Sequence, residues 1–178
     1  GAPLYSSYLI VAADRDVDTI VQLEGDIHAF SDPDSNSGHL VTRAALAEIR
    51  RRPEEFFRRT IFTWGHRNVV RAVGSGLAMS GSVDGYVYEV LAQTEPKLTE
   101  GTRVVRRSEL LGFPPVACLR AQAASAPVHA LRQALLEMHE SPDGRDVLNI
   151  LKMDGFVQGS PDLFQGIAEK VRQVRSFG

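Results

Sequence analysis

The chain has 178 residues, of which 43% are apolar and 24% charged, a composition typical of a globular protein with a substantial core. Its 20 basic and 22 acidic residues are well mixed and give a net charge of −2, so no basic stripe indicates nucleic acid as a partner. The single cysteine, Cys118, excludes an internal disulfide, and no apolar run approaches the length of a membrane span. Residues 1–3 lack the charged and apolar regions of a signal peptide. A secreted protein also lacks them after its signal peptide has been removed, so this observation does not decide the compartment.

Short apolar runs alternate with helical patterns along the chain, which favours an α/β architecture. In chain order, the pattern predicts strand 8–13, helix 17–25, strand 26–30, helices 39–51 and 53–59, strand 61–64, helix 69–75, strand 78–82, helix 84–91, strands 102–107 and 116–121, and helices 128–140, 143–153 and 161–174. In such folds, ligands bind where strands end and helices begin. Three consecutive turns of this kind carry groups suited to an anion.

The first of these turns is Ser35-Asn36-Ser37-Gly38, directly before a predicted helix. Its hydroxyls would lie beside the unpaired backbone N–H groups and the partial positive charge of a helix start, which together suit an anion without any full cation. Gly38 would allow close approach of the backbone. The alternative is plain N-capping, a common use of serine and asparagine.

The other candidate groups are His66, Asp84 and Tyr5. His66 follows a strand and a glycine, so it could donate a hydrogen bond to an oxyanion, and a bound anion would favour its protonated form. Asp84 opens a predicted helix and could accept a hydrogen bond from a protonated phosphorus oxygen or pair with a cationic arm of a ligand. Tyr5 precedes the first strand and could present its hydroxyl. Taken singly, these residues are equally consistent with helix caps, a surface histidine and a packed tyrosine.

Several stretches resemble, in order, the phosphonate-, phosphite- and phosphate-binding proteins of ABC importers. The resemblance rests on Tyr5-Ser6-Ser7-Tyr8-Leu9-Ile10-Val11, Asp32-Pro33-Asp34-Ser35-Asn36-Ser37-Gly38, Gly65-His66 with the segment 69–73, Val83-Asp84-Gly85-Tyr86, Ser108 to Val116, and Leu151 to Phe156. The second stretch is similar to the family's Asp-Pro-x-Ser-x-Ser-Gly anion loop, and the third to its Gly-His segment. The match spans nearly the whole chain.

The resemblance implies that Ser35, Asn36 and Ser37 grip the phosphorus oxygens, with His66, Tyr5 and Asp84 as the family's histidine, hinge tyrosine and acid. Two positions depart from the pattern. Phe113 stands where binders of aminoalkyl phosphonates carry a second acid, so phosphate, phosphite or an alkyl phosphonate fits better. Arg67 stands where an acid often follows the histidine, and it would strengthen the binding of a dianion only if it pointed inward.

The family's fold is the two-lobed type II periplasmic binding fold, whose lobes close on the ligand by a hinge motion. The resemblance therefore implies a three-layer α/β/α lobe with a mixed sheet in residues 1–115, and a helical remainder of the second, incomplete lobe in residues 116–178. That remainder would expose apolar surface unless it packs on its own lobe, exchanges with a partner chain or belongs to a longer protein. We therefore expect a homodimer through the incomplete lobe or an atypical packing.

The implied function is to bind a small phosphorus oxyanion as the substrate-binding component of an ABC importer. The implied partner is the transporter permease, the implied location is the periplasm, and neither a cofactor nor a metal is implied. Three alternatives stay open. They are a ligand-sensing input domain on the same fold, a hydrolase using Ser35, His66 and Asp84 as a triad, and a structural module whose polar turns only cap helices.

Overall fold

A computed structural model describes residues 2–177, which divide into two compact units. The larger unit comprises residues 4–112 and 164–177, and the smaller comprises residues 2–3 and 113–163. The strands are β1 (Leu4–Tyr5), β2 (Ser7–Ala12), β3 (Ile27–Phe30), β4 (Arg59–Phe62), β5 (Ser80–Asp84), β6 (Thr102–Arg107) and β7 (Leu111–Gly112). The α-helices are α1 (Val41–Glu48), α2 (Pro53–Phe56), α3 (His66–Gly74), α4 (Gly85–Thr94), α5 (Pro96–Thr99), α6 (Ala126–Leu136), α7 (Pro142–Leu151) and α8 (Gln165–Phe177).

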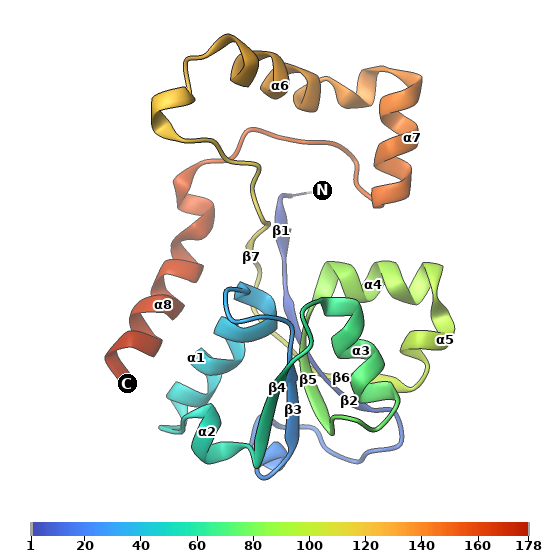
Figure 1. Cartoon of the computed structure of the whole chain (residues 1–178), viewed down its shortest axis with the longest axis vertical. Coiled ribbons are helices and arrows are strands. Elements are labelled where there is room, and N and C mark those ends of the chain that lie inside the picture. The colour runs from blue at the N-terminus through green and yellow to red at the C-terminus, as the bar shows by residue number, and fades with distance from the viewer. Residues whose placement is uncertain (1, 178) are drawn as a thin grey trace. The chain divides into compact units, whose positions relative to one another are not determined.

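Five strands of the larger unit form one mixed sheet in the order β4-β3-β5-β2-β6. β3 runs parallel to β4 and β5, whereas β2 runs antiparallel to β5 and β6. A second sheet of two short strands pairs β1 with β7. In Figure 1, α1 and α2 lie on one side of the five-stranded sheet and α3, α4 and α5 on the other. This arrangement confirms the three-layer α/β lobe with a mixed sheet.

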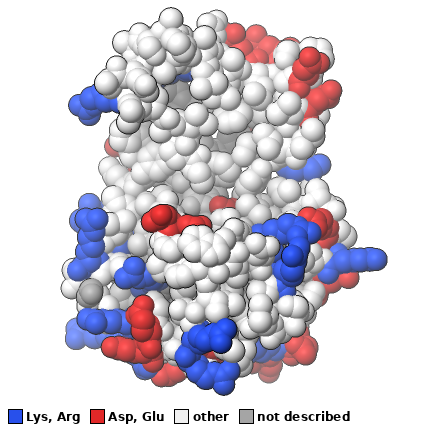
Figure 2. Space-filling view, viewed as in Figure 1, with Lys and Arg blue, Asp and Glu red and all other residues white. Residues whose placement is uncertain are grey.

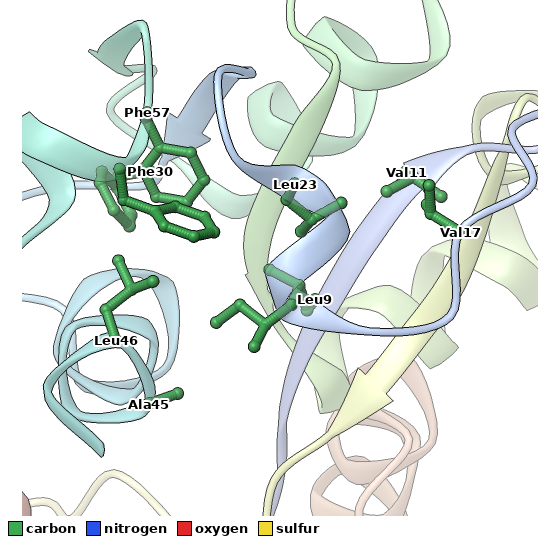
Figure 3. Close-up of a cluster of buried hydrophobic side chains, with 10 residues drawn as sticks. Leu9, Val11, Val17, Leu23, Phe30, Ala45, Leu46 and Phe57 are labelled. Carbon is green, nitrogen blue, oxygen red and sulfur yellow. The ribbon is translucent and has the colours of Figure 1, made fainter. Parts of the chain in front are cut away.

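Each face of the sheet buries its own apolar cluster. On one face, Leu9, Phe30 and Leu46 pack with residues of α2 and the turn after β2, and Figure 3 shows the side chains of α1 directed at the strands. On the other face, Val83 packs against the α3 side chains Val69 and Val73. The alternation of side chains along β2 and β3 supplies both clusters, with Leu9 and Phe30 on one face and Ile10 and Ala29 on the other, since successive residues point to opposite faces.

Helix α8 belongs to the larger unit, which differs from the predicted boundary at residue 116. It packs along α1, and the Gln173 Nε2 donates to the Ala44 carbonyl oxygen at 3.3 Å. Lys170 pairs with Glu109 at 2.5 Å. The end of the chain therefore returns to the α/β lobe, to which a hydrogen bond and an ion pair hold it.

The smaller unit contains α6, α7 and the short 3₁₀ turns Arg120–Gln122 and Met138–Glu140. The predicted strand 116–121 is wrong, since residues 116–119 are irregular. A strand must pair its N–H and C=O groups with a neighbour, and the described residues of this unit contain no other strand. Among these residues, Leu148 is the one large apolar side chain that is buried, while Leu119 and Ile150 are more than 70% exposed.

Charges are interspersed over the visible face of the larger unit, where basic and acidic side chains alternate (Figure 2). Surface ion pairs of this unit include Arg51 with Glu24 and Arg106 with Glu48. Residues 2–177 include no helix with the length and apolar character needed to cross a bilayer.

Candidate functional site

The anion loop (residues 32–38) leaves β3 and winds directly into a helix. Ser35 has an extended backbone and its Oγ accepts a hydrogen bond from the Gly38 N–H at 2.9 Å, which is an N-cap. The next turn, Asn36–Leu40, is a π-helical turn that runs into α1, and the Leu40 N–H donates to the Ser35 carbonyl at 3.0 Å. Wide turns of this type recur at functional sites.

Gly38 lies where no side chain fits. A Cβ at this position would stand 1.9 Å from Ser31 Oγ, 2.7 Å from Ser31 Cβ and 3.0 Å from His66 Cε1. The absence of a side chain therefore lets the His66 ring lie directly against the backbone of the anion loop.

Ser37 is buried at the centre of the site. Its Oγ donates to Asp84 Oδ2 at 3.3 Å, and its side chain also bonds the hydroxyl of Tyr5. The Ser37 carbonyl accepts from Ser7 Oγ at 2.6 Å, so both the backbone and the side chain of Ser37 are held.

His66 is the first residue of α3, and its Nδ1 accepts a hydrogen bond from the Asp84 backbone N–H at 3.1 Å. Burial lowers the pKa of His66, and the opposing effects of Asp84 and Asp32 are smaller. The ring is therefore neutral and carries its proton on Nε2, which makes that atom a donor. The sequence predicts that a bound anion would favour the protonated ring, and without a ligand the geometry already supplies a donor that carries no charge.

Asp84 ends β5 and caps α4, since its Oδ1 accepts from the Val87 N–H at 3.2 Å. Burial raises the pKa of this carboxyl above its ordinary value, while bonds from the Val87 and Tyr86 amides, the nearby His66 and the Ser37 hydroxyl oppose the rise. Burial likewise raises the pKa of Tyr5. A carboxyl in this setting can accept a hydrogen bond from a protonated ligand oxygen.

Four of the six predicted site residues thus converge: Tyr5, Ser37, His66 and Asp84. Ser35 lies in the same loop but uses its hydroxyl as a cap, and Asn36 contributes the start of the π-helical turn. Ser7 was missed because its role depends on strand pairing: in the register of β2 with β5 it lies opposite Asp84.

The two departures from the family pattern are Arg67 and Phe113. Arg67 points to Glu95, with Nε to Oε1 at 2.9 Å and Nη2 to Oε2 at 2.5 Å, so its charge is directed away from the anion loop. Phe113 belongs to the smaller unit, where its N–H donates to the Pro3 carbonyl.

The bonds among Ser35, His66 and Asp84 do not form a hydrolytic triad within the described residues. Nδ1 of His66 accepts from the backbone of Asp84 and does not donate to its carboxylate, and the Ser35 hydroxyl bonds Gly38. A triad needs a serine–histidine bond and a histidine oriented by a carboxylate.

Comparison with solved structures finds the same fold in several binding proteins. PhnD1 from Prochlorococcus marinus in complex with methylphosphonate has a TM-score of 0.80 at 16% identity, over 97% of this chain and 68% of that one. The binding-protein component of a phosphonate ABC transporter from Pseudomonas aeruginosa has a TM-score of 0.82 at 22% identity, over 100% and 61%. XAC2383 from Xanthomonas citri bound to ATP has a TM-score of 0.70 at 18% identity, over 99% and 69%. The chain thus spans about two thirds of the length of these proteins.

A search of curated proteins finds no significant match. The family model described as "ABC transporter, phosphonate, periplasmic substrate-binding protein" matches residues 1–164. Since that match covers most of the chain, the protein belongs to the periplasmic phosphonate-binding family of ABC transporters.

Proposed function

We propose that this chain holds a small phosphorus oxyanion, namely phosphate, phosphite or an alkyl phosphonate, as part of the substrate-binding component of an ABC importer. The observation that carries the proposal is the convergence of Tyr5, Ser37 and the neutral His66 around the start of the helix that carries Gly38. The family implies a phosphonate-type ligand, a permease as partner and a location outside the cytoplasm.

The chemistry of the site favours an oxyanion that keeps one proton. A bound oxyanion would accept from the Nε2–H of neutral His66 and compete with Asp84 for the Ser37 proton, so no full positive charge would offset a dianion there. Asp84 adds an acceptor with a raised pKa. One proton shared between Asp84 and a phosphorus oxygen would remove their repulsion and add a strong hydrogen bond. A fully ionised oxyanion such as sulfate has no such proton.

The test is calorimetric titration of the full-length protein with phosphate, phosphite, methylphosphonate and sulfate. Loss of one hydrogen bond to a charged group costs about 1.5–3 kcal/mol, so Ser37→Ala and His66→Ala should each weaken binding roughly tenfold to a hundredfold. Ser75→Ala and His129→Ala are matched controls, because Ser75 follows α3 at the end away from His66 and His129 is exposed on α6. Absence of heat with every phosphorus oxyanion, or full affinity in both site variants, would refute the proposal.

A further inference from the structure

Strand β5 presents a row of polar side chains to α1. Ser80, Ser82 and Asp84 alternate along the strand, so they point to the same face, and none is more than 5% exposed. Asp84 belongs to the candidate site. The two serines are fully buried on the sheet face that carries Leu9 and Phe30, where hydroxyls need partners.

His28 on β3 supplies those partners. Its Nδ1 lies 2.8 Å from Ser80 Oγ and its Nε2 lies 2.8 Å from Ser82 Oγ. The ring is fully buried and stacks on Phe57, with 4.3 Å between the ring centroids. Burial lowers its pKa to about 3, so the ring is neutral, with one nitrogen donating and the other accepting.

The link from this pair to the site runs through Thr42. Ser82 Oγ lies 2.6 Å from Thr42 Oγ1, and Thr42 is buried in the first turn of α1. That turn continues directly from the π-helical turn that carries Ser37 and Gly38. Ser82 therefore holds the helix to β5 at one point, and Asp84, two residues further along the same strand, holds Ser37 at a second.

Hydrogen bonds between buried side chains fix a direction that apolar contacts leave free. A valine at position 42 would fill nearly the same volume as threonine, but it would not select one rotation of α1 over the sheet. The two fixed points determine how far the Ser37 hydroxyl and the Gly38 amide lie from His66 and Asp84. A site built from short, directional bonds is sensitive to such displacements.

We propose that His28, Ser82 and Thr42 are positioning residues for the oxyanion site, holding α1 so that the anion loop faces His66 and Asp84. The expected effect on ligand affinity rests on the proposed function. The restraint on the loop itself exists whether or not a ligand is known, and it can be measured separately.

The test compares Thr42→Val with Thr42→Ser in the full-length protein. Amide hydrogen exchange of residues 36–40 should become about tenfold faster in Thr42→Val, which corresponds to one lost hydrogen bond, and Thr42→Ser should restore the wild-type rate. Affinity for methylphosphonate should fall about fivefold to tenfold in Thr42→Val and stay within about twofold of wild type in Thr42→Ser.

Thr102→Val is the matched control for loss of a buried threonine hydroxyl. Thr102 lies on β6 and bonds the Tyr88 hydroxyl at 3.0 Å and the Thr99 carbonyl at 2.9 Å, with no bond to α1. It should lower overall stability without faster exchange in residues 36–40. Equal loop exchange in Thr42→Val and Thr102→Val, or no change in either, would overturn the inference.

A second pair decides the matter if Thr42→Val does not fold. Ser82→Ala removes the link between His28 and Thr42, whereas Ser80→Ala removes a His28 contact that does not reach α1. Faster loop exchange in Ser82→Ala alone supports the inference, and equal exchange in both contradicts it. If the wild-type protein binds no phosphorus oxyanion, the proposed function fails, while the exchange contrast still judges whether the loop is held.

Discussion

The two faces of the five-stranded sheet differ in what β5 presents to the helices that cover them. Toward α3 the strand offers Gly81 and Val83, and the contact is apolar. Toward α1 it offers Ser80, Ser82 and Asp84, each hydrogen-bonded to another element. Apolar contacts contribute stability with little preference for direction, whereas the bonds under α1 fix positions. The comparison teaches that β5 contributes mainly to stability on its α3 face and mainly to the positions of the site residues on its α1 face.

The largest effect that tests this separation is expected from Gly38→Ala against Gly81→Ala. At Gly38 the added methyl group would displace Ser31 or His66, so binding of methylphosphonate should weaken by at least about a hundredfold, near 3 kcal/mol. At Gly81 the methyl group would stand 2.6 Å from Val69 Cγ1 and 3.0 Å from Val73 Cγ2. Such overpacking should cost roughly 1–3 kcal/mol of unfolding free energy and leave affinity near that of wild type.

Calorimetric titration and denaturant unfolding of both variants provide the measurement. Gly74→Ala serves as a control for adding a methyl group, because a Cβ there would meet its nearest atoms at 3.6 Å, an ordinary contact. A large loss of affinity in Gly81→Ala, together with intact binding in Gly38→Ala, would remove the distinction between the two faces.

A second test uses the pH dependence of stability, because the face toward α1 buries His28. The folded pKa of His28, about 3, lies below the ordinary value of 6.5, so acid protonates the unfolded chain first. The contribution of His28 to stability is thus full above pH 6.5 and is lost as the pH falls toward 3. Between pH 7 and pH 4 the loss should be about 3 kcal/mol, at about 1.4 kcal/mol per pKa unit.

Urea unfolding of wild type and His28→Gln across this pH range measures the effect. The lowered pKa values of His39 and His66 act in the same direction, so the variant should flatten the pH dependence without abolishing it. His129→Gln, on the exposed surface of α6, should reproduce the wild-type curve. A His28→Gln curve parallel to that of wild type would mean that His28 does not distinguish the faces.

Much of this organisation was predictable from local patterns. The succession of strands, polar turns and helices predicted the α/β lobe, and the anion loop with Gly65-His66 located Ser37 and His66 correctly at helix starts. The hydrogen bonds of His28 with Ser82 and of Ser7 with Ser37 were not predictable, because they join residues more than 25 positions apart through the strand order. The tautomer of His66 was not predictable for the same reason, since it depends on the backbone N–H of Asp84 at the end of β5.

The smallest effect is expected at Arg67, the one residue next to His66 whose charge could have changed the site. Its guanidinium makes three hydrogen bonds to Glu95 across the surface, with Nε and Nη2 as donors. Because that pairing directs the charge toward Glu95 and into solvent, Arg67→Ala should change the affinity for phosphate and methylphosphonate by less than about twofold. The salt dependence of the affinity of Arg67→Ala for these ligands should match that of wild type.

Glu95→Gln is the informative companion to Arg67→Ala, because it weakens the pairing while keeping the arginine. If Arg67 is excluded from the site by its place on the outer surface of α3, releasing it should also leave affinity unchanged. A tenfold loss of affinity in Arg67→Ala would show instead that the site depends on a full positive charge. The neutral donors Tyr5, Ser37 and His66 would then be insufficient to hold the anion, and the geometry fixed under α1 would account for only part of binding.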